Sequence, residues 1–503
     1  MNVPAAGGPR RAWMIALLMV LALAFLGLRG IWDPDEGRYT NVALVMLDSG
    51  DWLNPRRNHE VGHWTKPPLT YWAIAASVGV FGPSPWAARL PGALAYLLCT
   101  WLTWRIARRL VPERADAAGV AFATMLLPFG ASQLVTTDML LTACDTLALW
   151  AFVEARFGSG RHPLRWSALL WVGLALAFLT KGPPGMLPLL PMLVFGLLVP
   201  RRQGRHLFDL AGLLVFALLA LPWYVAVIHG HPGLFAYFIG DEVVNRITTD
   251  EFGRHGEWYG WLEIYLPTLL IGTLPWTPSL WRSLRLLPMG LRRWRDMETR
   301  RSDAASVFIA LWWLLPLLVF CLSRSRMPLY LLPLFPALAL QVARQWAIES
   351  RQLPRWPWLA GWCALLLGLQ VAAAHWPTHK NAADWADVIR QRHPQPVREV
   401  IFVDDMARYG LHLHLGTQIE KVSLQPLPPH TGFGERDYDS DLAFELAEGE
   451  ADVVWITRQA AWQQVQGQLQ QRGFHGQALG APYRDRIIFT VQPLAGPDPA
   501  TGG

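Results

Sequence analysis

Two short polar motifs near the start of the chain carry the side chains that are best suited to chemistry. The first is D-P-D-E-G-R-Y at residues 33–39, and the second is T-K-P-P-L-T-Y-W at residues 65–72. Both border strongly hydrophobic sequence, where charged groups are unfavourable unless they serve a function. A carboxylate and an ammonium group at such a boundary could bind and activate a charged substrate at a membrane surface.

The acidic residues of the first motif have different expected roles. Asp33 before Pro34 predicts a helix N-cap with proline at the first helical position, and Glu36 completes a capping box. Asp35 is not needed for that cap, and Arg38, three residues later, can keep it ionised. We therefore expect a functional role for Asp35 and a structural one for Asp33 and Glu36.

Lys66 is the cation of the second motif. Pro67 and Pro68 keep the backbone extended where the chain leaves Lys66, and they are expected to start a helix. An ammonium group beside a helix N-terminus forms a site for an anion such as phosphate. The alternative is a lysine that extends to the lipid headgroups without binding a substrate.

Two further charged residues are expected at the ends of hydrophobic helices. Asp138 follows Thr136-Thr137 and either caps its helix or belongs to a site. Lys181, in K-G-P-P at residues 181–184, either binds phosphate or contacts headgroups. Asp145, seven residues after Asp138, lies deeper in the same segment and should meet a polar partner inside the protein.

Later segments supply an arginine and a tyrosine. Arg246 ends the motif D-E-V-V-N-R at residues 241–246, and Tyr330 ends R-M-P-L-Y at residues 326–330. A guanidinium group suits bidentate phosphate binding, whereas a tyrosine at a membrane boundary is often only an interfacial anchor.

The sequence H-E-V-G-H at residues 59–63 matches the zinc-protease pattern H-E-x-x-H. That pattern binds zinc only on a helix, where both imidazoles share a face. Gly62 and the flanking Pro55 and Pro67 disfavour a helix here, so we expect a solvated loop, with a lone surface metal site as the alternative.

The composition indicates a polytopic membrane protein. Of 503 residues, 52% are hydrophobic and 16% charged, whereas roughly 25% are charged in an average soluble domain. Apolar runs long enough to cross a bilayer recur up to His375. We predict spans at about 12–30, 86–104, 116–135, 139–157, 164–180, 183–199, 207–229, 258–281, 304–323, 328–347 and 357–375.

The loop arginines set the expected topology. They cluster on the side of the N-terminus, which the positive-inside rule makes cytoplasmic, so the net charge of +6 does not indicate nucleic-acid binding. Residues 68–81 are too short to span and should lie at the interface. Asp35, Lys66, Asp138, Lys181, Arg246 and Tyr330 then all fall on the external face.

The expected domains follow from the change of composition near residue 376. Residues 1–375 form a transmembrane catalytic domain with external interfacial helices at about 33–81. Residues 376–492 form a soluble α/β domain with strands near 398–404, 451–457 and 486–491 and a helix near 460–471. Residues 493–503 form a Gly/Pro-rich tail that we expect to be disordered.

Taken in order, the motifs resemble the integral-membrane glycosyltransferases that use polyprenyl-phosphate sugars. This family includes the lipid A aminoarabinose transferases and the protein O-mannosyltransferase-like group. The matching segments include P-D-E-G-R-Y at 34–39, K-P-P-L-T-Y-W at 66–72, T-T-D at 136–138, L-T-K-G at 179–182, E-V-V-N-R at 242–246, Y-L-P-T-L-L-I-G-T-L-P-W at 265–276 and M-P-L-Y-L-L-P-L-F-P at 327–336.

The resemblance implies a C-type glycosyltransferase fold, mainly α, with about 11–13 spans and a small soluble α/β C-terminal domain. It implies that Asp35 is the catalytic carboxylate and that Lys66 and Arg246 hold the lipid phosphate. Further substrate-binding residues would be Arg38, Asp138, Lys181 and Tyr330. The implied reaction moves a sugar, with inversion, from polyprenyl (undecaprenyl) phosphate to an envelope acceptor: lipid A or lipopolysaccharide, another glycan, or a protein. The implied location is the inner membrane, with the active site and the C-terminal domain external, or periplasmic.

The sequence departs from the aminoarabinose transferases at two positions. Thr65 replaces the glutamate that usually precedes the lysine, and Val243 replaces a histidine of the later loop. Both departures remove potential metal ligands, which argues against a divalent cation as cofactor and against aminoarabinose as the sugar. A glycolipid transporter and a non-catalytic membrane scaffold are the alternatives. A transporter would need ionisable groups near the membrane midplane, where only Asp145 is a fair candidate.

Overall fold

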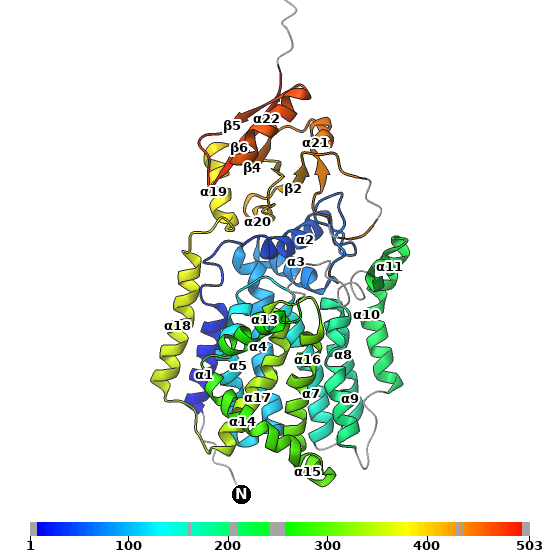
Figure 1. Ribbon diagram of the computed structural model, residues 1–503, viewed down its shortest axis with the longest axis vertical. Coiled ribbons are helices and arrows are strands. Elements are labelled where there is room, and N and C mark those ends of the chain that lie inside the picture. The colour runs from blue at the N-terminus through cyan, green and yellow to red at the C-terminus, as the bar shows by residue number, and fades with distance from the viewer. Residues whose placement is uncertain are drawn as a thin grey trace, which may run out of the picture. The chain divides into compact units, whose positions relative to one another are not determined.

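The computed structural model describes residues 8–158, 162–200, 209–240, 257–428, 432–434 and 436–494 (Figure 1). The chain divides into two compact units. The first, which we call the helical unit, contains Met1–Leu26, Lys66–Ala73 and Arg89–Ala373. The second, the sheet unit, contains Gly27–Thr65, Ile74–Ala88 and Ala374–Gly503.

The helical unit consists of helices with short connections. In chain order the elements are α1 (Gly8–Leu23), the start of α3 (Leu69–Phe81), most of α4 (Pro85–Leu110), η1 (Pro112–Arg114), α5 (Ala115–Thr124), α6 (Leu126–Ser132), α7 (Asp138–Phe157), α8 (Pro163–Lys181), η2 (Pro183–Met186), α9 (Leu189–Leu198), α10 (Leu210–Gly230), α11 (Leu234–Ile239), α13 (Gly260–Gly272), α14 (Thr277–Arg293), α15 (Met297–Ser302), α16 (Ala304–Leu322), η4 (Pro328–Leu334), α17 (Phe335–Ile348) and α18 (Trp356–Ala374).

Several of these helices can cross a membrane. In the described part of the chain, α8, α10, α16, α18 and the segment Pro328–Ile348 are long and apolar enough. A sixth span results if Pro112–Thr124 and Leu126–Ser132, bent by 56° to each other, form one broken span. The predicted polytopic, mainly α fold is thus confirmed, while other predicted spans fall on shorter or more charged helices, such as α1 and α7.

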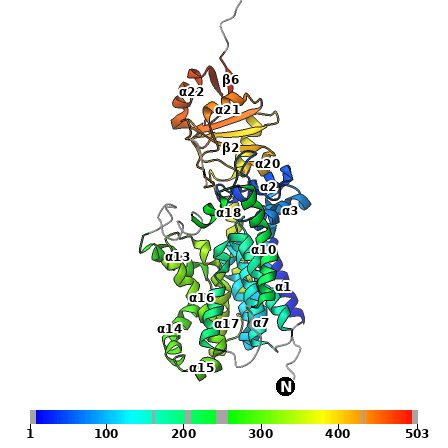
Figure 2. The same cartoon turned by 90° about the vertical axis from the view of Figure 1, so that its right-hand side faces the viewer.

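Small residues allow the helices of this unit to pack closely. A Cβ atom at Gly173 of α8 would lie 2.7 Å from the backbone nitrogen of Ala148 in α7. At Gly212 of α10 it would lie 2.0 Å from Cδ1 of Trp171 in α8. Glycine at these positions lets the backbones approach each other. Figure 1 shows α7 and α8 running side by side, and Figure 2 shows α7 again among the helices of this unit. Their packing matters because the two helices carry Asp138 and Lys181.

The sheet unit is built on six strands in the order β3-β2-β1-β4-β6-β5. The strands are β1 (Glu399–Val403), β2 (Gln418–Ser423), β3 (Ser440–Asp441), β4 (Val453–Arg458), β5 (Phe474–Ala478) and β6 (Arg486–Pro493). The first four in the sheet order are parallel, and β6 and β5 pair antiparallel. β1 is buried at all five positions, as expected for a parallel strand covered on both faces.

Helices complete the sheet unit. They are α19 (Ala382–Arg392), α20 (Leu411–Leu415), α21 (Leu442–Glu448) and α22 (Trp462–Gln471), with the short η5 (Gln459–Ala461) before α22. The strands predicted near 398–404, 451–457 and 486–491, and the helix near 460–471, are confirmed.

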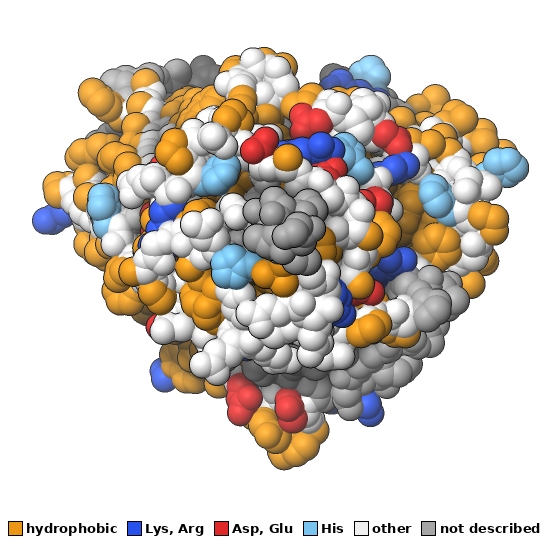
Figure 3. All heavy atoms as spheres, turned by 90° about the horizontal axis from the view of Figure 1, so that it is seen from above, with side chains coloured by type: hydrophobic (Ala, Val, Ile, Leu, Met, Phe, Trp, Pro, Cys, Tyr) orange, Lys and Arg blue, Asp and Glu red, His pale blue; other side chains and the backbone are white. Residues whose placement is uncertain are grey.

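Figure 3 shows acidic and basic side chains beside one another on the face seen from above, without one large basic patch.

The sheet unit also contains α2 (Asp35–Ser49), which carries the first polar motif. His412 of α20 fixes this helix. Its Nδ1 lies 2.7 Å from Oδ1 of Asn41, and its Nε2 lies 3.1 Å from Oδ2 of Asp48. α2 is therefore part of the folded core of this unit.

Candidate active site

Asp35 begins α2 and presents its carboxylate to solvent. Arg38 donates a hydrogen bond to Asp35 Oδ1 at 2.9 Å, as the spacing of three residues predicts. The Asp35 side chain remains 57% exposed, whereas that of Arg38 is 20% exposed. Asp35 is thus an accessible carboxylate with a cation fixed beside it, which is the arrangement that a catalytic carboxylate needs.

The predicted capping box of α2 is wrong. The N-cap position is Pro34, and no side chain caps this helix. The buried carboxylate of Asp33 accepts a hydrogen bond from the backbone N–H of Gly410 at 3.0 Å. Glu36 pairs with Arg29 at 2.6 Å and accepts from the backbone N–H of Trp32 at 3.0 Å. Both residues are structural, as expected, but they bind partners that lie outside the helix.

The contact between Asp33 and Gly410 leaves no room for side chains. A Cβ atom at Gly37 would lie 1.7 Å from Oδ1 of Asp33, and one at Gly410 would lie 2.8 Å from Cγ2 of Ile31. Glycine is required at both positions. Burial raises the pKa of Asp33 to about 8, despite the hydrogen bond from Gly410. The start of α2, and with it Asp35, is therefore rigidly positioned.

The helical unit brings together three of the predicted site residues. α8 ends at Lys181, α7 begins at Asp138, and η4 contains Tyr330. Lys181 Nζ lies 2.5 Å from Oδ1 of Asp138 and 4.5 Å from the centre of the Tyr330 ring. The Lys181 and Asp138 side chains are only 12% and 10% exposed. Thr137 occupies the N-cap position of α7, so Asp138 forms this ion pair instead of capping its helix.

Lys66 lies in the helical unit next to this cluster. It is half-buried, and the residues after it pack on α7 and α8. Leu69 contacts the buried group formed by Leu141, Cys144 and Ala177. A Cβ atom at Gly182 would lie 4.0 Å from Cγ of Pro67. Lys66 and Lys181 therefore enter the same region of the helical unit from different segments.

Two predicted positions, Arg246 and Val243, lie outside the described residues. Asp145 is buried in α7 and is influenced by the charge of Lys181. One of its carboxylate oxygens has no hydrogen-bond partner among the described residues, so the expected polar partner is not found there.

The H-E-x-x-H segment is a loop, as predicted. The backbone N–H of Arg57 donates to the carbonyl of Val61 at 2.8 Å, and that of His63 donates to Pro55 at 2.8 Å. His63 Nε2 lies 2.9 Å from the hydroxyl oxygen of Thr65. These turns do not place His59 and His63 on one helical face, so the zinc-protease arrangement is not formed.

Three carboxylates of the sheet unit could hold a cation. Oxygens of Glu399, Glu420 and Glu445 lie within 4.8 Å of one another. Burial and the neighbouring carboxylates raise the pKa of Glu399 and of Glu420. Asn58 donates a hydrogen bond to Glu420 at 2.8 Å. Protons shared among the three carboxylates can therefore offset the negative charge of this cluster.

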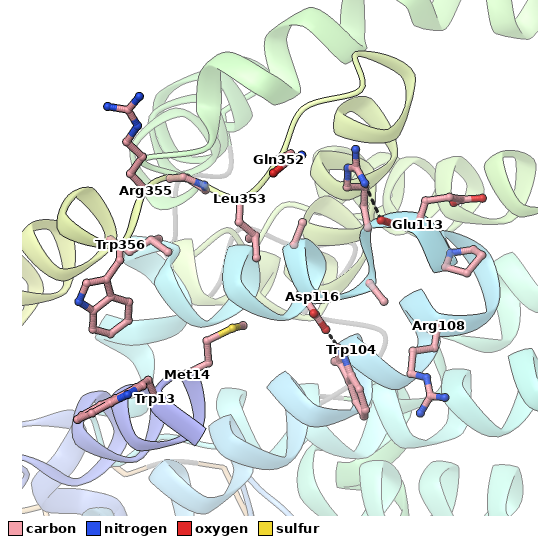
Figure 4. Close-up of a pocket in the computed structure, with 16 residues that line it drawn as sticks. Trp13, Met14, Trp104, Arg108, Glu113, Asp116, Gln352, Leu353, Arg355 and Trp356 are labelled. Carbon is pink, nitrogen blue, oxygen red and sulfur yellow. Dashed lines mark hydrogen bonds between the residues drawn. The ribbon is translucent and has the colours of Figure 1, made fainter. Parts of the chain in front are cut away.

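A cavity of about 900 Å³ in the helical unit is lined by residues of α1, α4, η1, α5 and α18 (Figure 4). Trp104 Nε1 donates to Asp116 Oδ1 at 2.8 Å in its wall, and Arg108 and Arg355 are among its cations. None of the predicted site residues that the structure describes lines it. It is separate from the Lys181 cluster.

Comparisons with known proteins show which proteins this chain resembles. Residues 65–226 match the family model of dolichyl-phosphate-mannose-protein mannosyltransferases. An undecaprenyl phosphate-alpha-4-amino-4-deoxy-L-arabinose arabinosyl transferase of Pseudomonas aeruginosa (strain UCBPP-PA14) is 33% identical over 344 residues, which cover 66% of this chain. The resemblance predicted from the motifs is confirmed. The match spans 59% of the length of that relative.

Solved structures show the fold. The crystal structure of ArnT from Cupriavidus metallidurans bound to undecaprenyl phosphate superimposes with a TM-score of 0.77 at 21% identity, over 98% of this chain and 100% of that one. The arabinofuranosyltransferase AftD from Mycobacteria gives a TM-score of 0.54 at 17% identity, over 98% of this chain and 40% of that one. The predicted C-type glycosyltransferase fold is confirmed.

Proposed function

We propose that this protein is an inverting glycosyltransferase that moves a sugar from undecaprenyl phosphate, or a related polyprenyl phosphate, to an envelope acceptor. The acceptors that we consider are lipid A or lipopolysaccharide, another glycan and a protein. The observation that carries the proposal is the exposed Asp35 carboxylate, held by Arg38 at the start of a helix whose first turn is fixed by Asp33 and Glu36.

The chemistry follows from the nature of the donor. The bond that breaks joins the anomeric carbon to a phosphate oxygen, so the leaving group needs cationic stabilisation and no acid. Lys66 and Arg246 supply that charge. An acceptor hydroxyl attacks from the opposite face while Asp35 orients it and takes its proton, which inverts the anomeric centre. An acceptor that is already a phosphate anion needs no base, and Asp35 then stabilises the positive charge that develops on the sugar.

The cluster of Lys181, Asp138 and Tyr330 has a positioning role in this mechanism. Asp138 neutralises Lys181 and holds its amino group in one direction over the Tyr330 ring. A largely buried ion pair of this kind can bind a polar substrate by hydrogen bonds while adding little net charge. We infer that it lines the donor cavity beside Lys66.

We also infer the orientation in the membrane. The arginine-rich loops support a cytoplasmic N-terminus and an external, or periplasmic, active site in the inner membrane of the cell. The C-terminal residues that form the sheet would then be external as well.

One observation favours a different function. Asp145 is buried in α7 without a hydrogen-bond partner for one oxygen, as expected of a proton-coupled transporter. Purified protein incubated with an undecaprenyl-phosphate sugar and cell-envelope lipids separates the two functions. We expect release of free undecaprenyl phosphate, measured by mass spectrometry, together with one new glycosylated product. A transporter or a scaffold would release none.

A further inference from the structure

The sheet unit contains a second cavity, of about 370 Å³, next to the motif that carries Asp35. Its walls come from the loop before α2 and α2 itself, from the residues that follow β1, from β2, from the 436–438 loop and from the end of β4. All of these segments belong to the sheet unit. The cavity is therefore defined without reference to the helical unit.

Positive charge predominates in this cavity. Five cationic side chains and three carboxylates line it. One of the cations, Arg57, is paired at 2.6 Å with Asp439, which lies behind the wall. One of the carboxylates, Asp405, is held at 2.9 Å by Arg486, which also lies behind the wall. In each of these two pairs the opposite charges neutralise each other, so the other lining residues determine what the cavity binds.

Three of the remaining cations have no ion-pair partner in the described part of the chain. They are Lys421 of β2, Arg436 of the loop and Arg458 at the end of β4. Lys421 Nζ lies 4.5 Å from the centre of the Tyr438 ring, which holds the ammonium group in place. Three cations converging in one cavity suit an anion with several oxygens, such as a phosphate group.

The same cavity also offers groups for a saccharide. Asp404 and Asp437 line it, and Asp404 forms a hydrogen bond with the Tyr438 side chain. Carboxylates accept hydrogen bonds from sugar hydroxyl or amino groups, and an aromatic ring supplies an apolar face. A cavity that served only inorganic phosphate would gain nothing from these acidic groups.

Arg38 connects the cavity to the proposed catalytic group. It lines the cavity together with Pro34, and it donates a hydrogen bond to Asp35 at 2.9 Å. We propose that the cavity binds the phosphorylated sugar headgroup of the acceptor, with the phosphate on Lys421, Arg436 and Arg458. This assignment rests on the proposed glycosyl transfer, because it names the site from which the acceptor reaches Asp35.

Binding to the full-length protein in detergent tests the cavity directly. Glucosamine 1-phosphate is the probe, with glucosamine and inorganic phosphate as the two halves of its chemistry. We expect the probe to bind more tightly than either half, and each of Lys421→Gln, Arg436→Gln and Arg458→Gln to weaken it about tenfold. Arg398→Gln is the matched control, since Arg398 is 66% exposed in the same unit, pairs with Glu450 and does not line the cavity.

The outcomes that overturn the proposal are specific. Unchanged binding in all three variants removes the cavity as the site. Equal binding of inorganic phosphate and glucosamine 1-phosphate leaves a plain phosphate site and removes the saccharide. Arg458→Lys keeps the positive charge, so this variant should retain most of the wild-type affinity. If Arg458→Lys binds the probe as weakly as Arg458→Gln, the loss of binding reflects a structural defect and counts against the assignment.

Turnover in the same preparations separates this inference from the proposed function. Substitutions at the three cations should raise the apparent KM for the acceptor about tenfold. The apparent KM for the undecaprenyl-phosphate donor should stay unchanged. If the apparent KM for the donor rises instead, the cavity binds the donor, and the acceptor site is overturned. If the wild-type protein releases no undecaprenyl phosphate, the glycosyltransferase proposal fails, whatever the binding result.

Discussion

Two carboxylate–cation pairs among the predicted site residues lie in very different surroundings. In the helical unit, Lys181 and Asp138 are almost fully buried and 2.5 Å apart. In the sheet unit, Arg38 and Asp35 are 2.9 Å apart, and the carboxylate is largely exposed. A buried pair is difficult to break because each charge depends on the other, whereas an exposed pair adds little stability and remains available to a substrate. The comparison suggests that one pair maintains geometry and the other performs chemistry.

The largest effect is expected at the exposed pair. Asp35→Asn keeps the shape of the side chain and removes its charge, so transfer should be abolished while the protein stays folded. Turnover of the purified variant, with thermal unfolding as the control for folding, measures this. A residual rate above about a tenth of wild type would limit the contribution of Asp35 to about 1.4 kcal/mol and contradict its catalytic role.

The buried pair should show the opposite behaviour. Asp138→Asn leaves the Lys181 charge without its partner, and we expect the free energy of unfolding to fall by about 3–5 kcal/mol. Arg38→Gln, which breaks the exposed pair, is the matched control and should change stability by less than about 1 kcal/mol. Thermal unfolding in detergent measures both variants. Equal destabilisation of the two would remove the distinction between the pairs.

The cations assigned to the donor phosphate sharpen the comparison further. Each charge-assisted contact contributes roughly 1.5–3 kcal/mol to binding, so Lys66→Ala or Arg246→Ala should raise the apparent KM for the donor about tenfold or more. If both residues bind one phosphate, the double variant should be non-additive, because independent sites add within about 0.5 kcal/mol. Strict additivity, or no effect of Lys66→Ala, would leave Lys66 as a headgroup contact.

A smaller effect should appear in the pH dependence of stability. Because the pKa of Asp33 is raised from 3.8 to about 8, the folded protein keeps a proton that the unfolded chain releases. Stability from this group is fully present below pH 3.8, falls as the pH rises above that value, and is lost once the pH has passed about 8. Asp33→Asn should remove this slope, which is at most about 1.4 kcal/mol per pH unit. Parallel unfolding curves for both proteins between acidic and alkaline pH would show that Asp33 does not hold that proton.

The smallest expected effect is that of metal removal. Thr65 and Val243 stand where metal ligands were expected, so turnover should survive exhaustive EDTA treatment. Metal content should be measured in parallel. Activity that is lost and then restored by a divalent ion would direct attention to His59, Glu60 and His63.

The sequence predicted those features that depend on neighbouring residues. The hydrophobic helices, the buried strands β1, β4 and β6, and the Asp35–Arg38 pair all follow from local spacing. The capping box failed because Asp33 and Glu36 instead bind Gly410 and Arg29. No local pattern indicates the partner of Asp33, because Gly410 lies 377 residues away along the chain. Arg29 is only seven residues from Glu36, but it precedes the helix and lies outside the capping pattern.

The second cavity was missed for a related reason. Lys421, Arg436 and Arg458 come from two strands and a loop, and each resembles an ordinary solvated charge in its own segment. β2 has the sequence Q-I-E-K-V-S, which lacks the continuous apolar run of β1 and was not predicted as a strand. Only the order of strands in the sheet, with β1 between β2 and β4, brings Lys421 and Arg458 to one cavity.

The absence of side chains at Gly37 and Gly410 has a consequence for how this protein can change over time. A methyl group at Gly37 would collide with Asp33, and one at Gly410 would collide with Ile31 and Asp33. A mutation at any one of these positions is therefore harmful on its own, although a matched set of replacements could restore the fit. The first turn of α2 should evolve as a block, so related chains should either keep Asp33, Gly37 and Gly410 together or replace all three.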